Sequence, residues 1–347
     1  MKSQNSITDF LSRKISHFMA VMTLFVVFIH YSSSYVSNVD GINSLRILDY
    51  FGQGITRNAV PLFFFMSGIL TFFKVLNIDD VVRGTQKRIY SLGVPFLIWN
   101  VIAMLFYLSL DVLNGNAPLH QFTMRTLLEG LFLNKYLGPF WYIRYLLIFS
   151  FLSPLLYHII KKKYLAISFL CILVLLHLFN VWSMGALYYF LGGFLSMHYK
   201  GLIQNRFKAN VSIVLIILWV LLQIYRVASF DVSTDYVSAR ETMPYLIYEL
   251  FSPILMWFAF DFINYESVRV RKIEKHTFIV YAAHYMMVSL LTADAIESFF
   301  FIPNNSHIYT IVIFFIMPVV IYLTLAGISI FLQNKFNNLY KLLTGGR

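Results

Sequence analysis

The chain has 347 residues, of which 59% are apolar and only 12% are charged, and its formal net charge is +11. Soluble domains carry about 25% charged residues, so this composition excludes an ordinary soluble protein and indicates many membrane-spanning helices. The positive charge would also suit a nucleic-acid-binding protein, but the basic residues recur in short groups between apolar runs, as topology signals do.

A helix needs about 20 mostly apolar residues to cross a bilayer, and ten segments of the chain approach this length. We therefore predict an all-α, polytopic membrane protein with about ten transmembrane helices in a single membrane-embedded domain, residues 1–347. The sixth segment is short. The predicted spans are 17–36, 59–77, 89–112, 138–159, 164–182, 184–199, 209–228, 244–263, 276–295 and 308–331.

The basic residues predict the orientation of these spans. Most of the 27 Lys and Arg residues either precede the first span, as Arg13 and Lys14 do, or follow an even-numbered span. Cytoplasmic loops are enriched in Lys and Arg, so we predict that both termini are cytoplasmic. Segments 38–58 and 116–136 are too polar to span and are predicted to lie on, or dip into, the outer face.

His30 ends the apolar sequence VVFIH inside the first predicted span. Hydrocarbon disfavours a titratable group, so a histidine within a span is a candidate functional residue. The alternative is a structural histidine that forms a hydrogen bond to a neighbouring helix. The position of His30 in the sequence leaves both interpretations open.

Several basic residues stand at or inside the predicted spans. Arg57, near the outer boundary, is either a snorkelling anchor or a functional residue. Lys87 and Arg88, at the cytoplasmic end of span three, are either topology anchors or a grip for phosphate groups. Arg144 lies about one turn inside span four, where a charge is expected to face a cavity or a partner.

Two titratable residues in later spans complete the candidates. In span eight, Glu249 is a candidate partner for Arg57, Arg144 or His30. In span nine, His284 places a second imidazole at the middle of the membrane.

Other patterns predict packing or exclude known kinds of site. Ser67–Gly68 and the glycines of residues 185–193 are predicted to let helices pack closely. The lone Cys171 excludes a disulfide framework within one chain. The sequence has no HExxH, no P-loop and no Gly-x-Ser-x-Gly motif, so no metal site is expected.

Taken together, these stretches resemble the integral-membrane acyltransferase-3 family. Within that family they are most similar to surface-polysaccharide O-acetyltransferases, including the type that acetylates enterobacterial common antigen. The match extends over nearly the whole chain in the expected order. The matching stretches are VVFIH ending at His30, RNAVPLFFFMSG at 57–68, KRIYSLGVPFLIW at 87–99, PFWYIRYLL at 139–147, YYFLGGFLS at 188–196 and FIVYAAHYMMV at 278–288.

The resemblance implies an acyltransferase of the bacterial cytoplasmic (inner) membrane that takes its acyl group from an acyl-CoA, usually acetyl-CoA. It implies an acceptor hydroxyl on a surface glycan or on a lipid-linked saccharide, with membrane lipid as the surroundings and no nucleic acid as a partner. It also implies that His30 is the catalytic histidine. The family has an arginine eleven positions before this histidine, and Met19 stands there in this chain.

These observations predict a separate role for each candidate residue. His30 is expected to act as the general base for the acceptor hydroxyl. Arg57 or Arg144 is expected to stabilise the tetrahedral oxyanion or hold an anionic acceptor. His284 is expected to line the cavity or relay a proton.

Lys87 and Arg88 are expected to hold the phosphates of CoA at the cytoplasmic mouth. Two alternatives remain open at this point. The chain could be a transporter or flippase for lipid-linked sugars or acyl groups, although it lacks the internal repeats common in transporters. It could also be a catalytically silent relative in a polysaccharide-export complex, which the change to Met19 would allow.

Overall fold

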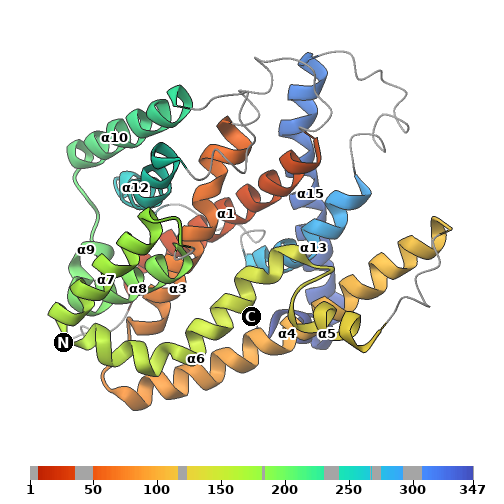
Figure 1. Cartoon of the computed structure of the whole chain (residues 1–347), viewed down its shortest axis with the longest axis horizontal. Helices are drawn as coiled ribbons and strands as arrows, with labels where there is room; N and C mark the ends of the chain where they lie inside the picture. Colours follow the sequence, from red (N-terminus) through yellow and green to blue (C-terminus); the bar gives the residue numbers. More distant parts are fainter. Residues whose placement is uncertain are drawn as a thin grey trace.

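The computed structural model of the chain describes residues 7–35, 50–115, 123–181, 184–229, 242–265, 267, 275–291 and 307–346. Every regular element within these ranges is helical (Figure 1). The longer helices are α1 (Asp9–Tyr35), α3 (Ala59–Phe72), α4 (Ile78–Leu113), α6 (Trp141–Lys161), α7 (Lys163–Leu178), α8 (Met184–His198), α10 (Ala209–Ala228), α12 (Met243–Ala259), α13 (Thr277–Leu290) and α15 (His307–Lys335). The shorter ones are η2 (Tyr50–Gly54), η3 (Ile55–Asn58), α5 (Met124–Phe132), η5 (Gly138–Phe140), α9 (Lys200–Gln204) and α16 (Asn337–Thr344).

Each of the ten predicted spans coincides with one of the longer helices. In the described part of the chain, six helical stretches are long and apolar enough to cross a membrane, and α7, α12 and α13 are apolar but shorter. The all-helical, multi-pass membrane class is therefore confirmed. The number of crossings and the cytoplasmic placement of both termini stay predictions.

Helix α4 begins at Ile78, well before the predicted start of span three at residue 89. The side chain of Asn77 accepts a hydrogen bond from the backbone N–H of Asp80 (3.1 Å), and the Asp80 carboxylate accepts one from the N–H of Asn77 (3.3 Å). This reciprocal cap satisfies N–H groups that a helix start leaves unpaired. The helix therefore extends through a charged stretch that apolar periodicity alone does not reveal.

Helices α3 and α8 contact each other backbone to backbone. A Cβ atom added at Gly68 would overlap the carbonyl oxygen of Tyr189, and one added at Gly192 would overlap that of Phe65. Glycine permits this approach because it has no side chain. The predicted close packing at Gly68 and at the glycines of residues 185–193 is confirmed, and the two sets are each other's partners.

The segments that the charge pattern places on one side of the membrane contact one another at one end of the bundle. Two of the contacts are hydrogen bonds to backbone carbonyls, two place a lysine over an aromatic ring and one is a buried ion pair. The pairs are Thr8–Gln204 (3.4 Å), Arg206–Phe262 (2.7 Å), Lys200–Phe73 (5.2 Å to the ring centroid), Lys163–Tyr199 (4.9 Å) and Lys14–Asp261. This clustering is what an alternating path through the bundle requires.

The C-terminal helix α16 turns back onto the middle of α4, near the centre of the view in Figure 1. The indole Nε1 of Trp99 donates to the carbonyl of Leu343 (3.0 Å). Gly345 follows with a φ of +70°, and a Cβ added there would overlap the carbonyl oxygen of Ser91. The end of the chain is therefore part of the packed bundle.

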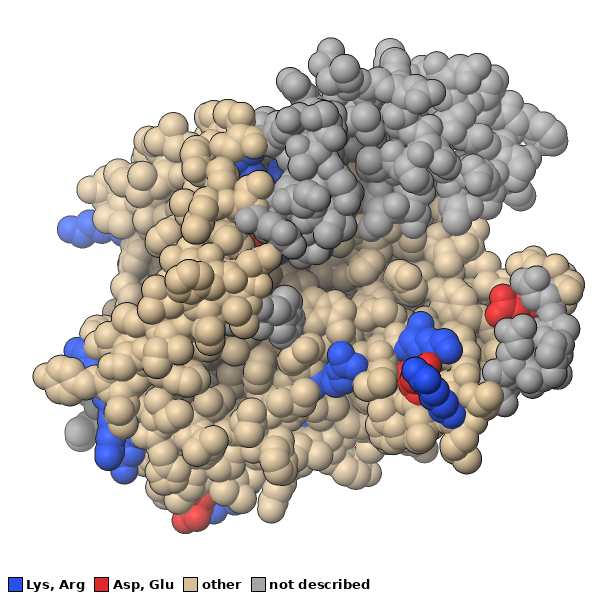
Figure 2. All heavy atoms as spheres, in the orientation of Figure 1, with Lys and Arg blue, Asp and Glu red and all other residues tan. Residues whose placement is uncertain are grey.

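The outer surface is largely apolar. Figure 2 shows a face on which charged side chains are few and scattered. Large apolar side chains of α4, α6, α10 and α15 are exposed, as expected where helices contact lipid tails. Examples are Leu105, Phe151, Leu155, Ile217, Leu221 and Phe331.

Candidate functional site

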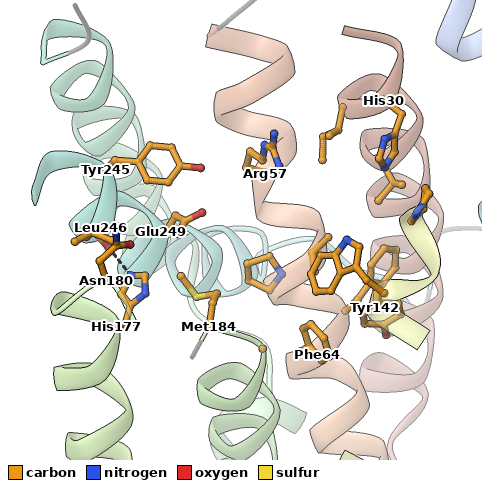
Figure 3. Close-up of a pocket in the computed structure, with 18 of the residues that line it drawn as sticks. His30, Arg57, Phe64, Tyr142, His177, Asn180, Met184, Tyr245, Leu246 and Glu249 are labelled. Atoms are coloured by element: carbon orange, nitrogen blue, oxygen red, sulfur yellow. Dashed lines mark hydrogen bonds between the residues drawn. The ribbon is translucent and has the colours of Figure 1, made fainter. Parts of the chain in front are cut away.

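A cavity of about 400 Å³ lies between the helices that carry His30, Arg57 and Tyr142 on one side and the helices α7, α8 and α12 on the other (Figure 3). The rings of Phe63 and Phe64 belong to its apolar lining. A cavity with apolar walls and a few polar groups is typical of a ligand site. Its polar lining consists of His30, Arg57, Tyr142, His177, Asn180, Tyr245, Glu249 and Tyr281.

Helix α1 brings His30 to the cavity. Residues four apart share one face of a helix, and Val26 lines the cavity together with His30. The ring of His30 also contacts α13, with its centroid 5.1 Å from that of His284 and 5.3 Å from that of Tyr285, which it meets edge-on. His30 thus contacts both the cavity and His284 of α13.

His284 lies behind His30, fully buried, and does not itself line the cavity. Its Nδ1 is 2.6 Å from the carbonyl oxygen of Tyr281. A carbonyl only accepts hydrogen bonds, so Nδ1 carries the proton and the Nε2 of the neutral ring is an acceptor. Within the described ranges this Nε2 has no hydrogen-bond partner.

Arg57 lines the cavity from η3, the short helix that precedes α3. The neighbouring Thr56 and Asn58 are buried, so this end of segment 38–58 enters the bundle, while its first twelve residues lie outside the described ranges. Asn58 donates to the hydroxyl of Tyr248 (3.1 Å), which in turn donates to the carbonyl of Gly54 (2.9 Å). These bonds tie the turn that carries Arg57 to α12.

Arg144 is not among the residues that line this cavity. It is half-buried on α6, and its guanidinium lies 5.6 Å from the ring centroid of Tyr145. Arg144 follows Tyr142 by two residues, which is about 200° of rotation along an α-helix. Arg144 therefore lies on a different face of α6 from Tyr142 and is placed beside the ring of Tyr145.

Lys87 and Arg88 also lie away from the cavity, near the start of α4. Lys87 is exposed. The guanidinium of Arg88 donates to the carbonyl of Ser67 (3.3 Å) and to the hydroxyl of Thr71, so it ties α4 to α3. Lys87 and Arg88 are neighbours in the sequence, but their surroundings differ: Lys87 is exposed, whereas Arg88 bonds to α3.

Lys14 and Asp261 form a buried ion pair that was not among the residues singled out in the sequence. Both side chains are buried, and the Lys14 ammonium lies 3.9 Å from the ring centroid of Trp257. A usable signal was present, because Lys14 is four residues from both Phe10 and Phe18, which are also buried. Helical spacing places Lys14 on the core-facing side of α1 rather than among the surface lysines.

His177 lines the cavity, but the sequence did not identify it because no motif accompanies it. Its Nε2 lies 3.0 Å from the carbonyl of Leu246, so Nε2 is the donor and joins α7 to α12. Within the described ranges, no three His, Cys, Asp or Glu side chains are grouped so that they could hold a metal ion.

Comparison with known proteins gives one match. A family model described as an acyltransferase domain, that of the acyltransferase-3 family, matches residues 18–326. No curated protein and no solved structure is significantly similar to the chain. The matched region contains His30, Arg57, Glu249 and His284.

Proposed function

Because the chain belongs to the acyltransferase-3 family and is thus a membrane acyltransferase, we propose that it is an O-acetyltransferase of the bacterial cytoplasmic membrane. Its donor is acetyl-CoA or another acyl-CoA. Its acceptor is a hydroxyl of a surface polysaccharide or of a lipid-linked precursor, as in the enzymes its ordered stretches resemble. The observation that carries the proposal is the cavity, which brings His30 and Arg57 into one space.

His30 is the general base in this scheme. A neutral imidazole has a free ring nitrogen that can take the proton of a hydroxyl group as it attacks. As the acceptor hydroxyl attacks the thioester carbonyl carbon, its proton passes to His30. The C–S bond of the tetrahedral intermediate then breaks, the thiolate takes the proton back from His30, and free CoA and the ester leave.

Arg57 supplies the charge that the intermediate needs. The attack places a negative charge on the former carbonyl oxygen, and a guanidinium beside it stabilises such an oxyanion. The hydrogen bonds around Asn58 and Tyr248 hold the turn that carries Arg57. We assign no step to Arg144, which lies outside the cavity.

His284 is a positioning residue for His30. Its proton is committed to the Tyr281 carbonyl, so its Nε2 can accept a hydrogen bond from the neighbouring imidazole. Such a bond would select the tautomer of His30 whose other nitrogen faces the cavity as the base. The Tyr281 hydroxyl donates to the Pro139 carbonyl, which commits it to structure.

Lys87 and Arg88 are proposed to attract the phosphates of CoA. Lys87 is exposed and available for an ion pair, whereas Arg88 already bonds to α3 and would contribute mainly through its charge. In this scheme Lys87 is the stronger determinant of donor affinity.

The test uses purified protein, acetyl-CoA and an extract of membrane glycolipids, with release of free CoA as the readout. We expect wild-type protein to release CoA and His30→Ala to lose about 10²-fold or more of that rate. His158→Ala, at an exposed histidine of α6, is the matched control. Wild-type rates in a folded His30→Ala variant would overturn the assignment of the base, and transport without CoA release would identify a transporter.

A further inference from the structure

The cavity has a second polar end across from His30 and Arg57. Figure 3 shows Asn180, Tyr245 and Glu249 on the side of the cavity formed by α7 and α12. The chemistry proposed above uses none of these residues. Their helices bring together a carboxylate, an amide and an aromatic ring, although they are far apart in the sequence.

Glu249 is the most informative of these residues. Glu249 lines the cavity and is half-buried. Among the residues that the structure describes, its carboxylate forms no ion pair and no hydrogen bond. Its neighbours on α12, Tyr248 and Leu250, are respectively buried and half-buried. An ionisable group in a helix of this kind is costly and points to a ligand or a pathway.

The backbone that carries Glu249 is held in place. Pro253 has no N–H, so it cannot form the usual helical bond to the carbonyl of Glu249, four residues earlier. The hydroxyl of Tyr188 on α8 donates to this carbonyl (3.2 Å) and to that of Leu250 (2.9 Å). These bonds fix the backbone position from which the Glu249 side chain enters the cavity.

The chemistry of this end selects the kind of ligand. A carboxylate accepts hydrogen bonds from hydroxyl groups, and an amide such as that of Asn180 both donates and accepts. The ring of Tyr245 offers an aromatic surface beside them. The negative charge of Glu249 disfavours an anionic group at this end, so a neutral, hydroxyl-rich ring fits best.

We propose that Glu249, Asn180 and Tyr245 form the subsite that binds a neutral sugar ring of the acceptor. This inference rests on the proposed acyl transfer to a saccharide, and it adds the residues that hold the saccharide and the charge it carries. Glu249 accepts hydrogen bonds from hydroxyls of the ring. The hydroxyl to be acylated then extends toward His30.

Kinetics with Glu249→Gln test the subsite. The protein is reconstituted in nanodiscs of phosphatidylethanolamine and phosphatidylglycerol and supplied with acetyl-CoA and the glycolipid extract. We expect the KM for the extract to rise about tenfold, because a neutral amide with one acceptor oxygen replaces a charged acceptor with two, while the KM for acetyl-CoA stays within about twofold. Glu129→Gln, on the exposed helix α5, is the control and should change neither constant. An unchanged acceptor KM, or equal changes in both constants, would refute the subsite.

A binding measurement separates this inference from the proposed function. Trp141 lines the cavity, so its fluorescence can report occupation. We expect octyl β-D-glucopyranoside to bind wild-type protein, and Glu249→Gln to bind it about tenfold more weakly. The anionic octyl glucuronide should gain affinity in Glu249→Gln, because the opposing charge is gone.

Failure of the proposed transfer reaction and failure of the sugar subsite then give different results. If wild-type protein consumes no acetyl-CoA but shows this glycoside pattern, the transfer reaction is refuted and the sugar subsite stands. If transfer occurs but the glycosides fail to bind, or bind both proteins equally, the subsite is refuted. Preference of the wild type for an octyl aminoglucoside over the glucoside would replace the neutral sugar by a cationic one and would also overturn the proposal.

Discussion

The imidazole rings of His30 on α1 and His284 on α13 lie with their centroids 5.1 Å apart at the wall of the cavity. The Tyr281 carbonyl occupies Nδ1 of His284 and leaves Nε2 as the acceptor. The pair therefore joins a residue that lines the cavity to one that does not. This contact predicts which amide side chain, that of Gln or that of Asn, can replace the imidazole of His284.

We expect His284→Gln to retain more activity than His284→Asn. The amide oxygen of Gln reaches the position of Nε2 and can still accept a hydrogen bond from His30, whereas Asn reaches only the position of Nδ1. The kcat of the Asn variant should fall about 10²-fold, and the acidic limb of its pH–rate profile should shift. Equal losses of kcat in both variants, with an unchanged pH–rate profile, would show that His284 contributes only to packing.

Arg57 and Arg144 should differ sharply when each is replaced. Arg57→Ala removes the guanidinium from the cavity, and kcat should fall about 10²- to 10³-fold, as on loss of an oxyanion donor. Arg144→Ala removes a side chain that does not line the cavity, and it should leave kcat near the wild-type value. A larger loss for Arg144→Ala would show that the cavity is not where the oxyanion forms.

The buried pair of Lys14 and Asp261 predicts a large effect on stability. Lys14→Met leaves an uncompensated buried carboxylate and should cost about 3–5 kcal/mol of unfolding free energy. The double variant with Asp261→Asn should recover a large part of that loss. Chemical denaturation in detergent measures both, and Arg83→Met, which breaks an exposed pair with Asp80, should have little effect. Additive losses in the double variant would contradict a direct pair.

The seam between α3 and α8 should not tolerate a methyl group. Gly68→Ala and Gly192→Ala each force a Cβ into a carbonyl oxygen of the facing helix, and each should cost about 1–3 kcal/mol or more. Gly84→Ala is the control, because nothing lies within 4 Å of a Cβ there. Thermal unfolding followed by circular dichroism should separate the two classes, and a stable Gly68→Ala variant would contradict the contact.

At the end of the chain, Gly345 and Gly346 form a matched pair of sites. Both have positive φ, so alanine costs a similar backbone strain at either position, but only at Gly345 would its Cβ meet the Ser91 carbonyl. Gly345→Ala should displace α16 and change the fluorescence of Trp99, which is bonded to Leu343. Gly346→Ala should not, and an identical response would show that strain rather than the contact matters.

Much of the helical framework could be predicted from the sequence. Apolar runs mark each long helix because lipid-exposed and buried faces are both apolar. Glycine pairs marked the close crossing at Gly68 and Gly192, since only small residues admit it. The true start of α4 was missed because it depends on a cap at Asn77 rather than on hydrophobicity.

The site was predicted less completely, since its residues come together only in three dimensions. His30 and Arg57 could be placed at a similar depth, but nothing local showed that α13 would bring His284 against His30. The burial of Lys14 could have been inferred from its spacing to Phe10 and Phe18. Its pairing with Asp261 could not, because that contact joins distant segments of one chain.

The glycine seam has a consequence for which hydroxyl reacts. Arg57 lies two residues before the start of α3, and Tyr188 of α8 holds the backbone of Glu249, so the seam connects the two polar ends of the cavity. The backbones of α3 and α8 are in direct contact at Gly68 and Gly192, so a bound ligand cannot easily increase the distance between the two polar ends. In the proposed complex, this fixed distance between the two polar ends determines which hydroxyl of the sugar reaches His30. We therefore expect strict regioselectivity, with one ester isomer formed, and a loosened seam should show itself first as a mixture of isomers.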